Sequence, residues 1–347
     1  MVEIRNTFRL ISYWKRLSLY IPFVLEYITM KDTETLRFTL KEVASMLKMI
    51  PFGKLVFMLI LLPAALLFAA GLANAEVYSL GDSLSDAGSL GFTYTNPATL
   101  TPLTRGKVWV QYLSSNSTPA FCNDPKHCLF NNDTFYYTGT GNNYAVGGAG
   151  VTFDSADAQV NNSYTNLHSQ IHALLHNHVL DKKDVITVWM GANDIIAATS
   201  NLNKSVSQVT YAAQVFTTEI SNLTKTGARI YVFTIPDLGR TPFGQTASDG
   251  GTLLSYLTNL FNSSISTLKN VNLIYSNEMF NTLYDQWPTP MIYCSVIIDP
   301  KHLCGDPKIN PINQDPTIPP TLLFADPEHP SNAAHQYIGN LLWAKIQ

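Results

Sequence analysis

Clusters of basic side chains and internal repeats are both missing from this sequence, and charged residues of any kind are few. Asp, Glu, Lys and Arg make up 14% of the 347 residues, and the formal net charge is −3. From Glu76 onward the chain holds 13 Lys and Arg against 20 Asp and Glu, which leaves −7. Because nucleic acid binding relies on grouped positive charge, we expect no nucleic acid partner.

Cysteine is also scarce. The chain has four, all of which follow the export signal that the N-terminus predicts: Cys122, Cys128, Cys294 and Cys304. An even number of cysteines in an exported chain favours disulfides, and four cysteines allow three pairings. Pairing between nearest neighbours, Cys122 with Cys128 and Cys294 with Cys304, would close two short loops. A zinc site is disfavoured, because its ligands would come from two distant segments in an oxidising compartment.

The N-terminus carries the pattern of a secretory signal. An apolar run from Leu55 to Leu72 follows Lys48 and Lys54 and ends at Ala73-Asn74-Ala75. A basic flank, an apolar stretch and an A-x-A site together predict cleavage after Ala75. The protein is then secreted, by way of the periplasm if the cell is Gram-negative. Left uncut, the run is long enough to act as a membrane anchor, which is the alternative interpretation.

This interpretation divides the chain into two regions. Residues 1–75 are an N-terminal extension plus signal peptide, in which Met46 or Met49 would be a more conventional start. Residues 76–347 form a mature chain of 272 residues, a size typical of one α/β domain. We therefore expect a single domain over 76–347.

Short apolar runs alternate with segments of helical period along the mature chain, which indicates βα units and a parallel sheet. Five runs predict strands: Val77–Leu80, Asn143–Val146, Val185–Met190, Arg229–Ile235 and Val271–Tyr275. Helical spacing predicts helices around Val209–Leu223, Leu253–Leu268 and His335–Lys345, with Gly227 as a stop after the first. Two stretches without periodicity, 89–142 and 287–325, predict long loops, which are usually functional inside a compact domain.

Four short segments combine the residue types that acyl transfer needs. They are Gly81-Asp82-Ser83-Leu84, Gly147-Gly148, Gly191-Ala192-Asn193-Asp194 and Asp326-Pro327-Glu328-His329-Pro330. Serine is a poor nucleophile at neutral pH unless a base accepts its proton and an acid orients that base. Ser83 follows the first predicted strand, at the sheet edge where open α/β folds place their sites. We therefore predict a catalytic triad of Ser83, His329 and Asp326.

A tetrahedral intermediate also needs preorganised hydrogen-bond donors for its oxyanion. The predicted donors are the backbone N–H groups of Ser83 and Gly148 and the side-chain amide of Asn193. Gly147 is the alternative to Gly148, since the two glycines are adjacent. These three groups complete a predicted oxyanion hole.

The acidic residues beside these segments receive plainer interpretations. Asp82 and Asp194 are interpreted as acceptors that tie loops together, and Glu328 as a solvated loop residue. Activity should rise as His329 loses its proton, because a protonated imidazole cannot act as a base.

Longer stretches around these segments resemble the conserved blocks of the GDSL, or SGNH, hydrolase family. The blocks are Gly81–Gly88, Gly106–Leu113, Asn143–Ala149 and Trp189–Asp194, and the resemblance runs from residue 77 to about residue 339. They resemble a narrower group, the secreted bacterial lysophospholipases A and glycerophospholipid:cholesterol acyltransferases, apart from Ser89, where that group usually carries Asn. The resemblance implies a three-layer α/β/α sandwich with a five-stranded, mainly parallel, flavodoxin-like sheet.

The same resemblance implies a lipolytic serine esterase that forms an acyl-enzyme on Ser83. Its substrates would be lysophospholipids or phospholipids, with cholesterol as a candidate acyl acceptor and peripheral contact with a membrane surface. It implies no cofactor and no metal. Two alternatives stay open: a short-chain or carbohydrate acyl esterase, and a non-catalytic surface binding protein on the same fold.

Three further features outside these segments carry hypotheses of their own. Histidines at 168, 172 and 176 share one face of a predicted helix and could bind a metal, but an exposed polar stripe explains them more simply. Aromatic residues of the first long loop could line an acyl groove, touch a membrane or form core. They are Phe121, Phe130, Phe135, Tyr136 and Tyr137. The segment Cys294–Cys304 is hypothesised to be a disulfide-closed lid beside the site.

Overall fold

The computed structural model describes residues 75–100, 103–114, 117–120, 141–156, 164–286, 292–299, 301–304 and 322–346. All of them belong to one unit, Asn74–Gln347. The predicted export signal lies outside the described residues, as do Cys122, Cys128 and the five aromatic residues of the first long loop. Within the described parts of the chain, no helix combines the length and the apolarity needed to cross a membrane.

Parallel strands form the main sheet in the order β1-β4-β5-β6. Their bounds are β1 Val77–Gly81, β4 Val185–Trp189, β5 Arg229–Phe233 and β6 Asn272–Ile274. Every residue of β4 is buried, as expected for a central strand of a sheet covered on both faces. The β-branched and apolar runs thus give the predicted parallel sheet, with each strand within two residues of its predicted bounds.

The predicted strand at 143–146 pairs with β1 but does not become a regular strand. Ser79 N donates to Asn142 O at 3.0 Å, Tyr144 N to Ser79 O at 2.7 Å and Val146 N to Gly81 O at 3.2 Å. The Asn143 side chain accepts a hydrogen bond from Ala145 N, so it competes with a regular ladder. Among the residues that the structure describes, the sheet therefore has four regular strands and one irregular edge segment, where five strands were expected.

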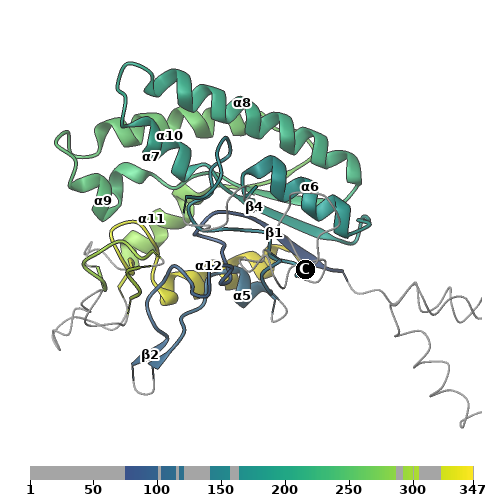
Figure 1. Ribbon diagram of the computed structural model, residues 1–347, viewed down its shortest axis with the longest axis horizontal. Coiled ribbons are helices and arrows are strands. Elements are labelled where there is room, and N and C mark those ends of the chain that lie inside the picture. Colours follow the sequence, from purple (N-terminus) through teal and green to yellow (C-terminus); the bar gives the residue numbers. More distant parts are fainter. Residues whose placement is uncertain are drawn as a thin grey trace, which may run out of the picture. The chain divides into compact units, whose positions relative to one another are not determined.

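Helices cover both faces of this sheet, so the fold is a three-layer α/β/α sandwich (Figure 1). One face carries α6 (Leu167–Asn177), α7 (Ala192–Ala198), α8 (Ser205–Leu223) and α10 (Thr252–Ile265), and the other carries α5 (Val110–Leu113) and α12 (Asn332–Ile346). The smaller elements are the hairpin β2 (Thr99–Leu100) and β3 (Leu103–Thr104), the turns η2 (Thr224–Thr226) and η3 (Leu238–Arg240), and helices α9 (Pro242–Gln245) and α11 (Ser276–Gln286). The predicted α/β class is confirmed.

Aromatic packing at the centre of the sheet fixes the loop that follows β1. The ring of Trp189 stacks on Phe233 with centroids 4.6 Å apart, and Trp109 lies 4.9 Å from Phe233. The indole N–H of Trp109 donates to Ser85 Oγ at 3.2 Å. Because Ser85 is two residues beyond Ser83, the core holds the segment that carries the candidate nucleophile.

One predicted disulfide is present. Cys294 and Cys304 are bonded, with their Cα atoms 5.8 Å apart. The predicted pairing of these two neighbours is therefore confirmed.

Candidate active site

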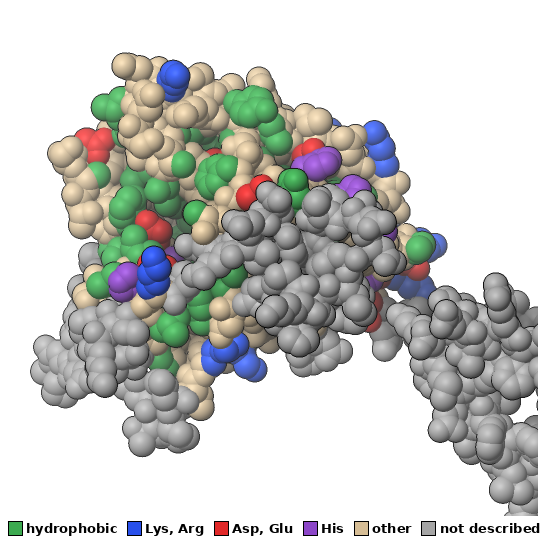
Figure 2. All heavy atoms as spheres, viewed as in Figure 1, with side chains coloured by type: hydrophobic (Ala, Val, Ile, Leu, Met, Phe, Trp, Pro, Cys, Tyr) green, Lys and Arg blue, Asp and Glu red, His purple; other side chains and the backbone are tan. Residues whose placement is uncertain are grey.

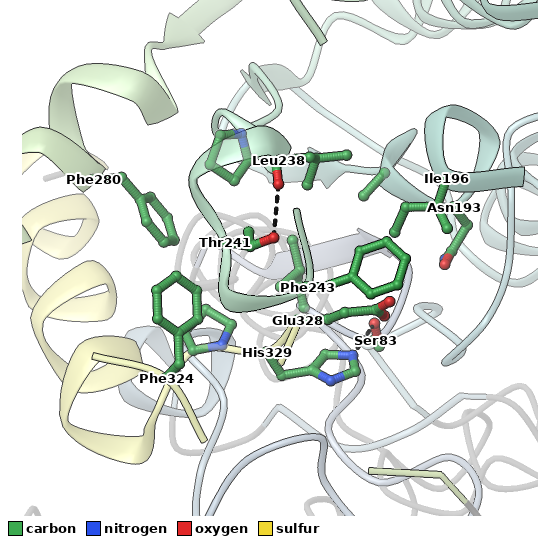
Figure 3. A pocket seen from close by; sticks show the side chains of 14 residues that line it. Ser83, Asn193, Ile196, Leu238, Thr241, Phe243, Phe280, Phe324, Glu328 and His329 are labelled. Carbon is green, nitrogen blue, oxygen red and sulfur yellow. Dashed lines mark hydrogen bonds between the residues drawn. The ribbon is translucent and has the colours of Figure 1, made fainter. Parts of the chain in front are cut away.

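The carboxyl ends of the parallel strands bring distant segments to one pocket (Figure 3). Ser83 follows β1, Asn193 lies on α7 just after β4, and Leu238 and Phe243 lie beyond β5. Phe280 is on α11 after β6, and the chain from residue 324 to 330 closes the remaining side. The pocket has an empty volume of about 520 Å³, which includes some open solvent. A parallel sheet has its loops gathered at this edge, which is why the pocket forms here.

Ser83, His329 and Asp326 form a continuous hydrogen-bonded chain at one end of the pocket. His329 Nε2 lies 2.8 Å from Ser83 Oγ, and His329 Nδ1 lies 2.7 Å from Asp326 Oδ2. A carboxylate can only accept, so Nδ1 carries the proton and Nε2 presents its lone pair to the serine hydroxyl. All three side chains are buried, with Ser83 8% exposed at the pocket wall. The arrangement has the geometry of a nucleophile, a base and an orienting acid.

Asp326 is held by more partners than the sequence indicates. Its Oδ1 accepts from the backbone N–H groups of Glu328 at 2.7 Å and His329 at 2.6 Å. Its Oδ2 accepts from Ile298 N at 2.7 Å in addition to the imidazole. Ile298 belongs to the disulfide loop, and no described residue of that loop lines the pocket. The loop thus lies beside the site, as hypothesised, and supports the acid through the Ile298 N–H; its role as a lid stays a hypothesis.

The pKa of His329 lies above its ordinary value of 6.5. Burial alone lowers it, because a charged ring is poorly solvated there, but the nearby carboxylates outweigh burial. The Asp326 carboxylate contributes most through its charge and its hydrogen bond, followed by Glu328 and Asp82. The imidazolium that forms during proton transfer is therefore stabilised in this site.

The predicted oxyanion donors lie on loops of defined conformation. The Gly147 N–H donates to Asp86 Oδ2 at 2.8 Å, whereas the described residues offer the Gly148 N–H no acceptor. Gly148 adopts φ +74°, a conformation that side-chain-bearing residues rarely adopt. Of the two neighbouring glycines, Gly148 therefore has the available donor. The pocket lining includes Ser83 but not Gly148.

Asn193 lines the pocket from the first turn of α7. One of its two Nδ2 hydrogens is used by Ala149 O, with a nitrogen-to-oxygen distance of 2.9 Å. This bond fixes the amide plane and leaves the second N–H for another acceptor. Gly191, directly before the helix, has φ +129°, and a Cβ there would meet the Phe261 ring at 2.5 Å. Only glycine allows this entry into α7.

Asp194 and Asp86 hold the loops around the site together, whereas Asp82, predicted to do the same, bonds only within its own loop. Asp194 accepts from Val151 N at 2.7 Å and from Thr152 N at 3.1 Å, which ties α7 to the loop of Gly148 as predicted. Asp86, which the sequence interpretation passed over, links the loop after β1 to Gly147. The Asp82 carboxyl accepts from Leu84 N at 3.1 Å, but its Oδ2 has no hydrogen-bond partner among the described residues.

Asp82 is a buried acid whose pKa lies well above its ordinary value. Burial raises its pKa from 3.8 to about 7, while the Leu84 N–H bond and the charge of His329 oppose this rise. Its carboxyl is therefore partly protonated near neutral pH.

Most of the pocket is an apolar surface that the sequence interpretation did not identify. We call Ile196, Leu238, Phe243, Phe280 and Phe324 the apolar wall, and Ser83, Asn193, Glu328 and His329 the polar end. Figure 2 shows hydrophobic side chains gathered on this face over the region of α7, α9 and α11, the helices that carry Ile196, Phe243 and Phe280. These residues come from separate elements, so no local pattern marks them as neighbours.

Glu328 does not match its interpretation as a solvated loop residue. It is half-buried and lines the pocket together with Ser83 and His329. Burial raises the pKa of its carboxyl, the positive charge of His329 lowers it, and Asp326 raises it further, with a net upward shift. In the short Asp-x-x-His loop, the backbone N–H of Glu328 donates to Asp326 Oδ1 at 2.7 Å, while its side chain lines the pocket.

The histidines on α6 belong to the surface. His168 Nδ1 lies 2.9 Å from Glu219 Oε1 on α8, and its side chain is 66% exposed. Within the described part of the chain, no group of three or more His, Cys, Asp or Glu residues is arranged to hold a metal ion.

Comparison with known proteins identifies the family to which the chain belongs. The family model for GDSL-like Lipase/Acylhydrolase matches residues 77–342, which includes every residue of the hydrogen-bonded chain at the polar end. The chain belongs to this family. GDSL hydrolases share an α/β fold with a parallel sheet, in agreement with the sheet described above.

Three individual proteins that the chain matches share 29% sequence identity or less with it. The chain is 29% identical over 180 residues to Lipase 1 of Photorhabdus luminescens, a match that covers 50% of this chain and 24% of that protein. The chain thus spans about a quarter of that relative. A Bacillus subtilis structure is 15% identical with a TM-score of 0.35, over 78% of this chain and 55% of its own. A proposed arylesterase from Agrobacterium tumefaciens is 17% identical with a TM-score of 0.39, over 78% and 98% of the two chains.

Proposed function

We propose that this protein is an exported lipolytic serine esterase that hydrolyses fatty-acyl esters of lysophospholipids and phospholipids. The observation that carries the proposal is the chain Asp326–His329–Ser83, with contacts of 2.7 and 2.8 Å, at the polar end of a pocket whose wall is otherwise apolar. Its membership of the GDSL-like lipase and acylhydrolase family supports the ester-hydrolase part of the proposal. The apolar wall supports a fatty-acyl chain as the group that is bound.

The proposed reaction proceeds in two steps through a covalent intermediate. His329 Nε2 takes the proton of Ser83 Oγ as the oxygen attacks the ester carbonyl, and Asp326 stabilises the imidazolium that results. The Ser83 and Gly148 N–H groups and the Asn193 amide then donate to the oxyanion. Collapse of the tetrahedral intermediate expels the alcohol, which receives the proton from His329, and leaves the acyl group on Ser83.

Release of the acyl group repeats the same chemistry with a second nucleophile. Water, deprotonated by His329, attacks the acyl-enzyme and releases the fatty acid. An alcohol such as a sterol can take the place of water, in which case the product is a sterol ester and the enzyme acts as an acyltransferase. The proposed setting is the surface of a lipid membrane or micelle outside the cytoplasm.

The test is fatty-acid release by the mature protein and by Ser83→Ala from three esters: lysophosphatidylcholine, a diacyl phospholipid and p-nitrophenyl acetate. A parallel set contains cholesterol. We expect turnover of long-chain lysophospholipid that is lost in Ser83→Ala, and sterol ester only if acyl transfer occurs. Turnover of acetate alone would replace the proposal with a short-chain esterase. The absence of all turnover in a folded protein would favour a non-catalytic binding protein.

A further inference from the structure

Glu328 brings a negative charge to the polar end of the candidate pocket. The described lining contains this carboxylate and His329 as its ionisable side chains, and no Lys or Arg. Figure 3 shows Glu328 at the same end of the pocket as Ser83 and His329, away from Phe280. A substrate whose ester carbonyl reaches Ser83 therefore brings its neighbouring groups close to this carboxylate.

The Glu328 carboxylate forms no ion pair within the described protein, and the positive charge that acts on it there is that of His329. The ion pairs there involve other acids, namely Glu219, Asp299 and Asp326, and no hydrogen bond reaches the Glu328 side chain from the described residues. It is half-buried, so water compensates its charge only in part. By contrast Asp326, two residues earlier, accepts four hydrogen bonds. A partly desolvated carboxylate without an ion-pair partner favours binding of a cation.

Aromatic rings of the same pocket favour one kind of cation. Phe243 and Phe324 line the pocket with Glu328, and Figure 3 shows Phe243 at the same end of the pocket as Glu328. Aromatic faces attract cations, and aromatic surroundings are the usual site for quaternary ammonium groups. A carboxylate beside phenyl rings suits a bulky organic cation better than a small hydrated ion.

We propose that Glu328 is a specificity-determining residue, which favours esters whose alcohol carries a cationic group such as a quaternary ammonium over otherwise similar esters whose alcohol is uncharged or only anionic. The inference rests on the proposed esterase function and narrows its substrate class. Among lipid esters, those whose head group ends in a quaternary ammonium then have an advantage over those whose head group is only anionic.

The same charge acts on His329, which supplies an independent readout. The groups that face the imidazole are Asp326 and Glu328 from its own loop, Asp82 after β1, the Tyr94 ring with its centroid 5.1 Å away, and His335 on α12. Glu328 is one of the three acids that raise the pKa of His329. Glu328→Gln should therefore move the acidic limb of the kcat/KM profile for an uncharged ester to lower pH.

The first experiment measures kcat/KM on three esters of one acid that differ in the charge of the alcohol. They are the choline ester, its uncharged isostere with carbon in place of nitrogen, and the isethionate ester. For the wild type we expect the choline ester to exceed the isostere by about tenfold, and the isethionate ester to fall below it. Glu328→Gln should bring the three values together, whereas Glu278→Gln, an exposed position on α11, should keep the wild-type order. An unchanged order in Glu328→Gln would overturn the proposal.

A second measurement needs no turnover and separates the two proposals. Calorimetry on Ser83→Ala compares the choline alkyl ether, which cannot be hydrolysed, with its uncharged isostere. We expect about tenfold tighter binding of the cation, lost when Glu328→Gln is added. Equal affinities would refute the role of Glu328. If the wild type turned over no ester while this binding preference was present, the esterase proposal would fail and the charge preference would stand.

Discussion

The polar end of the pocket and the apolar wall are held in place by different means. At the polar end three of the four side chains have a defined hydrogen-bond partner: Ser83 contacts His329, His329 contacts Asp326, and Asn193 donates to Ala149 O. The apolar wall has no such directional contacts and depends on side-chain packing from separate elements. Reaction chemistry needs fixed directions, whereas an acyl chain needs only an apolar volume. We therefore expect substitutions in the triad or at Asn193 to lower the rate on every ester, and substitutions in the wall or at Glu328 to change the choice among esters.

The largest expected effect at the polar end comes from Asp326→Asn. The amide adds a donor where Ile298 N and His329 Nδ1 both donate, so the imidazole loses the tautomer that accepts the serine proton. We expect kcat/KM to fall by about 10⁴-fold on long and short esters alike. The control is Asp285→Asn, at an exposed position on α11. A fall of less than tenfold would remove Asp326 from the triad.

Asn193→Ala should have the second largest effect. It removes one proposed oxyanion donor, which typically lowers kcat by about 10²–10³-fold with little change in KM. Asn259→Ala on the exposed side of α10 is the matched control. Steady-state kinetics on one lysophospholipid separates the two parameters. A rise in KM with unchanged kcat would instead make Asn193 a substrate-binding residue.

A wall residue should affect long acyl chains selectively. Phe243 is half-buried and lines the pocket from α9, so Phe243→Ala removes contact with the chain without opening the main core. We expect kcat/KM to fall about tenfold on a long-chain ester and to change little on an acetate ester. Tyr256→Ala, which alters an exposed aromatic residue on α10, should spare both substrates. Equal losses on both esters would contradict the division between the two ends.

The last prediction concerns stability rather than rate, and a neutral histidine close to the polar end. Burial lowers the pKa of His335 to about 3, with a further contribution from the charge of His329, whereas the unfolded chain protonates it near 6.5. Between these values the unfolded state binds the extra proton, so the free energy of unfolding falls as pH decreases, by about 1.4 kcal/mol per unit. His335→Gln should flatten this slope in urea titrations between pH 6 and 4, and the exposed His176→Gln on α6 should not. Equal slopes in all three proteins would show that His335 does not cause this dependence of the free energy of unfolding on pH.

The sequence predicted the polar end better than the wall for a physical reason. Groups such as Asp326 and His329 lie within one short loop, and Ser83 and Asn193 each follow a strand directly, so local patterns mark them. The position of an apolar side chain such as Phe280 depends on how α11 packs, which no local pattern specifies. The aromatic residues that the sequence suggested for an acyl groove lie at 121–137, outside the described residues.

Two other details required three-dimensional structure. Asn143–Val146 has the composition of a strand, but the Asn143 side chain binds the backbone locally and leaves an irregular edge. Ile298 contributes its backbone N–H to Asp326 across 28 positions, a contact independent of its side chain. In contrast, β4 was predicted within one residue, because its continuous β-branched and apolar run suits only a buried strand.

The central claim is that His329 activates Ser83 for attack, and fluorophosphonate labelling tests it most directly. Mass spectrometry of the wild type should find one adduct on the peptide that contains Ser83, and none in Ser83→Ala. The labelling rate should rise with pH and reach half its maximum above pH 6.5, since the pKa of His329 is raised. Absence of the adduct in folded protein, or a rate that stays flat from pH 5 to 9, would contradict the account.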